Sequence, residues 1–286
     1  MTESVEKTPV TAIVLTYNES QNIEKCLSHL QWADDRVIVD SFSEDDTVER
    51  ARACRVSCRI YQHEFTGFGD QRNWAISNTE PRHEWILFVD ADEFCTEDIA
   101  GEIGDFIQRP GGAVGAYIAG KNYFLGTWLK YSTYYPSYQL RLLKRGEVWF
   151  RNEGHGQREV TDGKLAYLES SWRHEPFSKG VEQWIARHNR YSTWEAHLRR
   201  AYLKDSTYGP ESVEADLFGD AQQRRRFLKK IAIRAPFEPL LWFLYHYVVC
   251  LGFLEGRPGL IASQIRRHYI SHVRAKMYEL RRQPGE

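Results

Sequence analysis

Short apolar runs alternate with stretches of helical character through the first 110 residues of the chain. Four runs rich in β-branched and aliphatic residues predict buried strands, at residues 10–16, 36–40, 58–62 and 85–90. Four stretches beside them are interpreted as helices, at residues 23–30, 45–53, 69–78 and 96–108. Strands that alternate with helices of this length form βαβ units, which predicts an α/β domain around a mostly parallel sheet.

The pattern changes after the Pro-Gly-Gly sequence at 110–112. Short strands without long helices between them are predicted at residues 116–124, 139–144, 148–151 and 165–168. Helices are predicted beyond them at residues 179–204, 214–233, 238–254 and 258–280. We therefore predict two parts, an α/β domain over 1–178 and a helical tail over 179–286.

Composition excludes a disordered chain, because 42% of the 286 residues are hydrophobic and the net charge is only −1. That near-zero charge hides two opposed parts. Residues 1–172 hold 18 basic and 27 acidic residues, whereas residues 173–286 hold 20 basic and 12 acidic ones. We expect no nucleic-acid partner.

Five scattered cysteines without zinc spacing and an N-terminus without a secretory pattern favour a cytoplasmic location.

The longest apolar stretch, LLWFLYHYVVCLGFL at 240–254, is shorter than the roughly 18–20 residues that a spanning helix needs, and His246 interrupts it. One interpretation is a buried helix. The other is a segment on a membrane surface, because a basic block precedes the stretch, at Arg224, Arg225, Arg226, Lys229, Lys230 and Arg234. We expect residues 224–254 to contact an anionic membrane surface, with the protein peripheral on the inner face of the cell membrane.

Polar and acidic groups follow three of the predicted strands, as Thr-Tyr-Asn-Glu at 16–19, Asp40, and Asp-Ala-Asp-Glu at 90–93. Open parallel sheets bind ligands beyond the carboxyl ends of their strands. Three carboxylates within four residues repel one another, and a divalent cation removes that conflict. Mg²⁺ or Mn²⁺ suits such oxygen ligands and commonly bridges them to substrate phosphates.

Four motifs appear in order over residues 10–95: TYNE at 16–19, VDSFSEDDT at 39–47, RNWA at 72–75 and DAD at 90–92. With them the chain resembles the family-two inverting glycosyltransferases of the GT-A fold. One departure is Asp46, where that family often has glycine. The resemblance implies a Rossmann-like catalytic domain over 1–178, with a nucleotide-sugar half at about 8–110 and an acceptor half at about 111–178. It also implies a C-terminal helical region, 179–286, that associates with a membrane.

The resemblance also implies roles for individual residues. The donor nucleotide sugar is expected to contact Thr16, Tyr17, Glu19, Asp40, Arg72 and Asp90. In this scheme Asp40 binds the base, in particular uracil. Asp92 binds the Mg²⁺ or Mn²⁺ ion on the diphosphate, and His174 completes the metal or diphosphate site. The cation and Arg72 allow an acidic cleft to accept an anionic donor.

An inverting transfer also needs a base for the acceptor hydroxyl. The candidates lie in NEGHGQRE at 152–159, which departs from the Val-His-Glu of relatives that glycosylate the lipopolysaccharide core. Glu153 and Glu159 are both candidates for the base, and His155 for an orienting residue. The acceptor implied by the resemblance is a glycan or lipid-linked precursor, such as a lipopolysaccharide core.

Two alternatives to a metal-dependent inverting glycosyltransferase remain at this point. A sugar nucleotidyltransferase would need a Gly-rich phosphate loop after the first strand, where this chain carries Glu19. A catalytically inactive membrane-bound scaffold of the same fold is disfavoured by the intact Asp90 and Asp92 pair.

Overall fold

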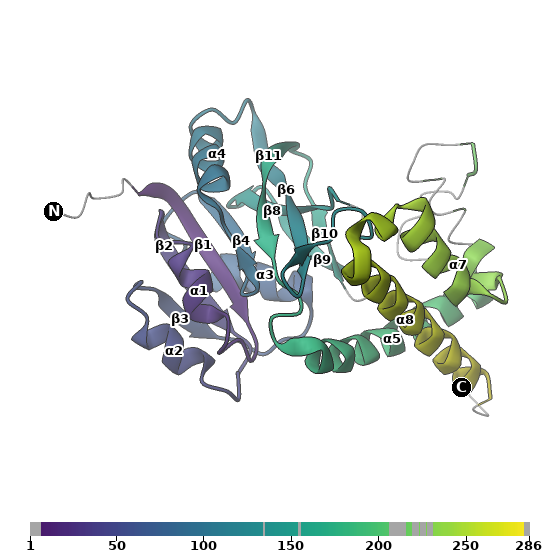
Figure 1. Ribbon diagram of the computed structural model, residues 1–286. Coiled ribbons are helices and arrows are strands. Elements are labelled where there is room, and N and C mark those ends of the chain that lie inside the picture. The colour runs from purple at the N-terminus through teal and green to yellow at the C-terminus, as the bar shows by residue number, and fades with distance from the viewer. Residues whose placement is uncertain are drawn as a thin grey trace. The chain divides into compact units, whose positions relative to one another are not determined.

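The computed structural model describes residues 7–133, 135–153, 156–205, 216–218, 223, 227 and 231–282 (Figure 1). It contains two compact units. The first comprises residues 1–128, 135–152 and 156–179, and the second comprises residues 129–134, 153–155 and 180–286. His155 and most of the basic block, Arg224 to Arg226 with Lys229 and Lys230, lie outside the described residues, as does most of the helix predicted at 214–233.

The first unit begins with four parallel strands in the order β3-β2-β1-β4. Their bounds are β1 Thr8–Thr16, β2 Ala33–Asp40, β3 Arg59–Gln62 and β4 Trp85–Asp90. The helices that connect them are α1 Ile23–Ser28, α2 Thr47–Ala53 and α3 Phe68–Asn78. This order confirms the βαβ pattern predicted from the sequence, and it brings Thr16, Asp40 and Asp90 to the same edge of the sheet.

The sheet continues with strands of both directions, so as a whole it is mixed. Its remaining strands are β5 Glu93–Phe94, β6 Ala113–Phe124, β7 Thr127–Trp128, β8 Tyr138–Lys144 and β11 Lys164–His174. Strand β8 is antiparallel to both β4 and β6, whereas β11 is parallel to β6 and antiparallel to β5. Helix α4 Glu97–Gln108 precedes β6, and β9 Trp149–Glu153 with β10 Gly156–Val160 forms a separate two-stranded sheet.

Apolar side chains of β1 alternate between two cores, one on each face of the sheet. Val10, Ala12 and Val14 belong to the core that also contains side chains of α1, α2 and α4. Ile13 belongs to the core that contains Phe88 and side chains of α3. Burial of both faces explains why the parallel strands are nearly continuous apolar runs in the sequence.

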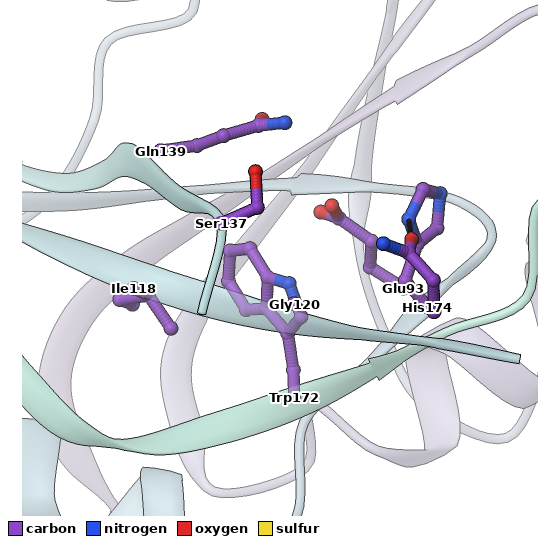
Figure 2. Close-up of a pocket in the computed structure, with 8 residues that line it drawn as sticks. Glu93, Ile118, Gly120, Ser137, Gln139, Trp172 and His174 are labelled. Carbon is purple, nitrogen blue, oxygen red and sulfur yellow. Dashed lines mark hydrogen bonds between the residues drawn. The ribbon is translucent and has the colours of Figure 1, made fainter. Parts of the chain in front are cut away.

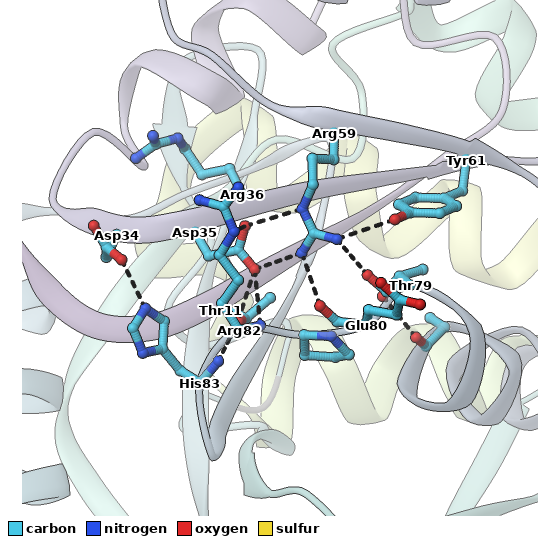
Figure 3. A network of polar contacts seen from close by, with 12 residues as sticks. Thr11, Asp34, Asp35, Arg36, Arg59, Tyr61, Thr79, Glu80, Arg82 and His83 are labelled. Atoms are coloured by element: carbon cyan, nitrogen blue, oxygen red, sulfur yellow. Dashed lines mark hydrogen bonds and ion pairs between the residues drawn. The ribbon is translucent and has the colours of Figure 1, made fainter.

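A network of polar side chains lies at the edge of the sheet opposite the carboxyl ends of β1 and β2 (Figure 3). Its centre is the buried carboxylate of Asp35, which accepts hydrogen bonds from Arg59 Nη2 at 2.7 Å and Thr11 Oγ1 at 3.0 Å. Burial alone would raise the pKa of Asp35, but these hydrogen bonds and one from the backbone of Arg82 lower it. Nearby, His83 Nε2 lies 2.8 Å from the exposed carboxylate of Asp34.

The second unit consists of α5 Gly180–Asp205, α7 Glu238–Leu244, the π-helical turn η1 Tyr245–Val249, the 3₁₀ turn η2 Gly252–Glu255 and α8 Gly256–Arg282. The helix predicted at 238–254 is therefore broken. Leu251 has a positive φ of 63°, and a Cβ on Gly252 would lie 2.7 Å from the carbonyl oxygen of His246. Helices α5 and α8 pack through Ala196, Val273 and Met277.

Most apolar side chains of the segment 237–254 are exposed in the second unit. They are Phe237, Leu240, Leu241, Leu244, Tyr245, Val248, Val249, Leu251, Phe253 and Leu254. His246 is buried instead, and its Nδ1 lies 3.0 Å from the backbone oxygen of Ser132. Within the described ranges no single helix has the length and apolarity to cross a bilayer; only the pair 238–249 and 252–282, bent by 71°, meets those criteria together.

Candidate active site

The turns after β1 and β2 are tied together by the buried carboxylate of Asp40. It accepts hydrogen bonds from Thr16 Oγ1 at 2.9 Å, from the backbone of Ser43 at 2.8 Å and from the Ser43 hydroxyl at 2.5 Å. Tyr17, at the same edge, is 49% exposed. Asp40 thus shapes this edge of the sheet in the structure, and a contact with a nucleotide base stays a prediction.

The Asp46 departure from the family motif is compatible with the turn before α2. Asp46 has an ordinary φ of −71°, so this position does not require the left-handed backbone that glycine favours. The neighbouring Asp45 carboxylate accepts hydrogen bonds from the backbone of Ser20 at 3.1 Å and of Thr47 at 3.1 Å. Asp46 therefore fits this turn without backbone strain.

Glu19 lies close to the DAD motif although 71 residues or more separate them in the sequence. Its carboxylate is nearly buried and accepts hydrogen bonds from Lys179 Nζ at 2.5 Å and Asn22 Nδ2 at 2.7 Å. Burial raises the pKa of Glu19, and the negative charge of Asp92 raises it further, against the effect of Lys179. The fold therefore gathers carboxylates from two different strand ends, as the sequence predicted.

Two arginines hold the carboxylates at the end of β4. Arg141 Nη2 donates to Asp90 Oδ2 and Glu93 Oε1, each at 2.7 Å, and Arg72 Nη2 lies 3.4 Å from Asp90 Oδ1. Both guanidinium groups are almost completely buried. Burial would raise the pKa of Asp90, but the charges of Arg141 and Arg72 hold it well below its usual range. Asp90 is thus kept ionised by residues from β8 and α3.

Arg141 was not among the site residues predicted from the sequence, and Glu93 was predicted only as one of the three carboxylates at 90–93, without a role of its own. Arg141 sits in the apolar strand sequence Tyr-Gln-Leu-Arg-Leu-Leu-Lys, between the buried Leu140 and Leu142. An arginine at such a position is rarely buried unless a carboxylate accompanies it, and this was the available signal. Burial raises the pKa of Glu93 to about 7 against the opposing charge of Arg141.

Asp92 and His174 form the pair of side chains with the chemistry of a metal site. His174 Nε2 lies 3.5 Å from Asp92 Oδ1, and His174 Nδ1 lies 2.7 Å from Asn122 Oδ1. A histidine that gives its Nδ1 proton to an oxygen presents Nε2 as a ligand. Burial lowers the pKa of His174, but the charge of Asp92 and their hydrogen bond outweigh it and raise the pKa to about 9.

The donor set of Asp92 and His174 fits a divalent ion that shares its coordination with a substrate. Mg²⁺ and Mn²⁺ typically take one or two protein ligands together with substrate phosphates and water. Over the described part of the chain, no group of three or more His, Cys, Asp and Glu side chains is arranged to hold an ion by itself. Among the described residues, Asp92 and His174 are thus two side chains that could hold part of such an ion's coordination.

The residues of the segment 152–159, which was predicted to contain the base, lie in different surroundings. Glu159 Oε1 accepts a hydrogen bond of 2.5 Å from the hydroxyl of Tyr117, and burial together with this hydrogen bond raises the pKa of Tyr117. Glu153 is partly buried at the end of β9. The structure instead brings Gln157, which the sequence did not single out, to 2.6 Å from Arg72 Nη1. Gln157 thus joins the Arg72–Asp90 pair.

Comparisons with known proteins agree with these motifs. The sequence model described as Glycosyl transferase family 2 matches residues 11–158, more than half of the chain. The lipopolysaccharide core biosynthesis glycosyltransferase LpsC of Rhizobium meliloti (strain 1021) is 23% identical over 281 residues, which cover 96% of this chain and 94% of LpsC. The SPbeta prophage-derived glycosyltransferase SunS of Bacillus subtilis (strain 168) is 33% identical over 103 residues, covering 35% of this chain and 24% of SunS.

Two solved structures show weaker similarity. S. aureus TarS 1-349 in complex with UDP-GlcNAc aligns with a TM-score of 0.44 and 14% identity, over 95% of this chain and 91% of that chain. Glucosyl-3-phosphoglycerate synthase from Mycobacterium tuberculosis, in complex with Mn²⁺, UDP and glucosyl-3-phosphoglycerate, aligns with a TM-score of 0.34 and 17% identity, over 41% and 44% of the two chains. The sequence match over residues 11–158 confirms the family prediction: this chain is a glycosyltransferase and belongs to glycosyl transferase family 2.

Proposed function

We propose that the protein is a metal-dependent inverting glycosyltransferase that uses a nucleotide diphosphate sugar, specifically a UDP-sugar. The observation that carries the proposal is the Asp92–His174 pair beside Asp90, which two buried arginines hold in its ionised form. A bound Mg²⁺ or Mn²⁺ ion on Asp92 and His174 would neutralise charge on the diphosphate leaving group. The family match favours this reaction over the nucleotidyltransferase alternative.

The chain's own residues have distinct tasks in this proposal. Thr16, Tyr17, Glu19 and Asp40 line the donor nucleotide at the ends of β1 and β2, while Arg72 and Asp90 orient the donor beyond β4. In the transfer, the acceptor oxygen forms a bond to the anomeric carbon as the bond from that carbon to the diphosphate oxygen breaks. The hydroxyl proton passes to a carboxylate, for which Glu153 and Glu159 are the proposed candidates, with His155 as an orienting residue.

The acceptor that we propose is a glycan or lipid-linked precursor, such as a lipopolysaccharide core. LpsC, whose name assigns it to lipopolysaccharide core biosynthesis, aligns with nearly the whole of this chain. That alignment includes the helical part beyond residue 179, which the family model does not reach. The similarity to LpsC therefore extends beyond the residues that the family model matches.

A binding experiment tests the donor proposal. The thermal midpoint of unfolding is measured with UDP-glucose, UDP-galactose, UDP-N-acetylglucosamine, UDP and ADP, each with Mn²⁺ or with EDTA. A ligand at 100 times its Kd stabilises the native state by about 2.7 kcal/mol. We expect an upward shift with at least one uridine ligand and Mn²⁺, and a much smaller one with EDTA or ADP. Equal shifts with and without Mn²⁺ contradict the metal dependence, and no shift with any ligand contradicts the donor class.

Glutamine variants test the proposed base. If Glu153 or Glu159 accepts the hydroxyl proton, its glutamine variant should bind UDP and Mn²⁺ with wild-type affinity but lose about 10²–10⁴-fold in kcat. Isothermal titration and single-turnover transfer separate these two quantities. Glu147→Gln, at an exposed position shortly before β9, is the matched control and should keep full turnover. Wild-type turnover in both variants would place the base elsewhere.

We also propose that the exposed apolar segment 237–254 binds an anionic membrane surface, which places the protein peripherally on the inner face of the cell membrane. Apolar side chains beside basic residues are typical of helices that lie in the interface of a bilayer. Leu241 and Val248 are exposed in the protein, and their apolar side chains would be removed from water when the segment binds a membrane. Leu241→Ser with Val248→Ser should therefore reduce partitioning to phosphatidylglycerol vesicles by about 10-fold.

Sedimentation with vesicles measures this partitioning. Ile185→Ser, at an exposed position of α5, is the control and should leave it unchanged. Vesicles of phosphatidylcholine should bind less protein than anionic ones, and added salt should reduce the difference. Unaltered partitioning of the double variant would exclude the segment 237–254 as the contact.

A further inference from the structure

A small hollow lies on one face of the strands β8, β6 and β11, next to the Asp92–His174 pair. The register places Gly120 opposite Trp172 and Asn122 opposite His174. Residues two apart on a strand point to the same face, so Gly120 stands between Ile118 and Asn122 on that face. The absence of a side chain at Gly120 therefore leaves a gap in an otherwise filled row.

The hollow has a volume of about 30 Å³ (Figure 2). Its walls are formed by Glu93, Ile118, Gly120, Asn122, Ser137, Gln139, Trp172 and His174. A single water molecule needs about 10–15 Å³ of such space. The hollow therefore admits one hydroxyl or hydroxymethyl group, but not a sugar ring.

The indole N–H of Trp172 points into this hollow. A Cβ built on Gly120 would lie 3.2 Å from Trp172 Nε1, so this nitrogen faces the space that the glycine leaves open. The Trp172 side chain is only 1% exposed. Among the residues that the structure describes, no acceptor is placed for this N–H. A ligand oxygen that enters the hollow would give this N–H a hydrogen-bond acceptor.

The chemistry of the walls favours a group with an oxygen acceptor. Trp172 supplies a donor, and the exposed Ser137 and Gln139 supply polar groups at the rim of the hollow. Figure 2 shows the Glu93 carboxylate and His174 on one side and Gln139 on the other. A sugar hydroxyl group satisfies these requirements.

We propose that this hollow is a specificity pocket that takes one hydroxyl group of the transferred sugar and binds it through the indole N–H of Trp172. The proposal rests on the proposed function, because it places the sugar next to a diphosphate held at Asp92 and His174. His174 lines the hollow and pairs with Asp92, so a group in the hollow lies beside the proposed leaving group. The sugar attached to that diphosphate is the nearest source of a hydroxyl.

Two variants alter the hollow in different ways. Gly120→Ala fills it with a methyl group, and Trp172→Phe removes the N–H while keeping an aromatic ring near the Arg141 guanidinium, which lies 5.2 Å from the Trp172 ring. Trp85→Phe, a buried tryptophan near the other end of the same sheet, is the matched control. Thermal unfolding of each variant measures the folded fraction.

Affinities of the full chain with Mn²⁺ are measured for UDP, UDP-glucose, UDP-galactose and UDP-N-acetylglucosamine. Both variants should bind UDP within about 2-fold of wild type. They should bind the sugar nucleotide that wild type prefers about 3- to 10-fold more weakly, the effect of one hydrogen bond. Monodeoxy analogues of that sugar nucleotide complete the test. For one of them, Trp172→Phe should cause no further loss, because the variant and the analogue remove the same contact.

Each other outcome has a separate meaning. Wild-type protein that binds none of the four ligands contradicts the proposed function itself. If the wild-type protein binds UDP as tightly as all three sugar nucleotides, the proposed pocket is wrong but the proposed function is not. The same conclusion follows if the two variants lose equal affinity for UDP and for the sugar nucleotide. A variant that keeps donor affinity but raises the KM for the acceptor would assign the pocket to an acceptor hydroxyl and overturn the proposal.

Discussion

Asp92→Asn should lower kcat/KM for sugar transfer by about 10²–10³-fold, equivalent to about 2.7–4 kcal/mol of transition-state stabilisation. Asparagine keeps the shape of the side chain but removes the charge that a divalent ion on the diphosphate requires. The variant should also lose the Mn²⁺-dependent part of its affinity for UDP. Steady-state kinetics and titration with UDP, with and without Mn²⁺, measure the two effects.

The chain contains a matched control for this substitution. Asp34 and His83 form a second carboxylate–histidine pair at the opposite edge of the same sheet, with 2.8 Å between Asp34 Oδ2 and His83 Nε2. Asp34→Asn should leave transfer and Mn²⁺ dependence unchanged. Asp92→Asn should itself keep a cooperative unfolding transition. If that variant retained full activity in the presence of EDTA, the metal-dependent part of the proposal would be wrong.

Arg141→Met should have the second large effect, because it removes the cation that the buried carboxylate of Glu93 shares with the partly exposed carboxylate of Asp90. Breaking a buried ion pair by deleting one partner typically costs about 3–5 kcal/mol. Glu93 would lose its 2.7 Å ion pair with Arg141, and Asp90 would keep its contact with Arg72 at 3.4 Å. We expect a fall of this size in the free energy of unfolding in urea, and weaker binding of UDP by the protein that remains folded.

Arg59→Met separates stability from function. Arg59 holds the buried carboxylate of Asp35 at the other edge of the sheet, with 2.7 Å between Arg59 Nη2 and Asp35 Oδ2. Its loss should also lower the free energy of unfolding, but the folded fraction should bind UDP normally. Arg141→Lys keeps the positive charge but not the guanidinium Nη2 that donates to both carboxylates, and it should recover part of the affinity. Wild-type UDP affinity in folded Arg141→Met would show that Arg141 acts on stability alone.

The predicted secondary structure was most reliable where local pattern and tertiary environment agree. Strands β1, β2 and β4 are buried on both faces, so their apolar runs were visible in the sequence. The helix predicted at 238–254 was the main error. Its composition indicated a continuous apolar helix, but the chain turns at Leu251 and Gly252, where the backbone of Gly252 lies against the carbonyl of His246. That close approach exists only because the chain reverses direction after His246, and it produces no pattern of hydrophobic positions in the sequence.

The sequence by itself determined the family, the α/β arrangement and the motif residues at the ends of β1, β2 and β4. These features are local, because a motif and the strand that carries it are adjacent in the chain. The tertiary structure alone decided which distant groups join them. Arg141 reaches Asp90 from 51 residues away, and Gln157 reaches Arg72 from 85.

The hollow at Gly120 likewise exists only because the register sets this glycine opposite Trp172. Hydrophobic periodicity specifies which face of a strand is buried, whereas the register between strands specifies which side chains meet. The motifs at the strand ends were therefore readable in the sequence, but the arginines that keep Asp90 ionised and the pocket proposed for the sugar hydroxyl were not. Those depend on long-range pairing, which a single sequence does not encode in any local pattern.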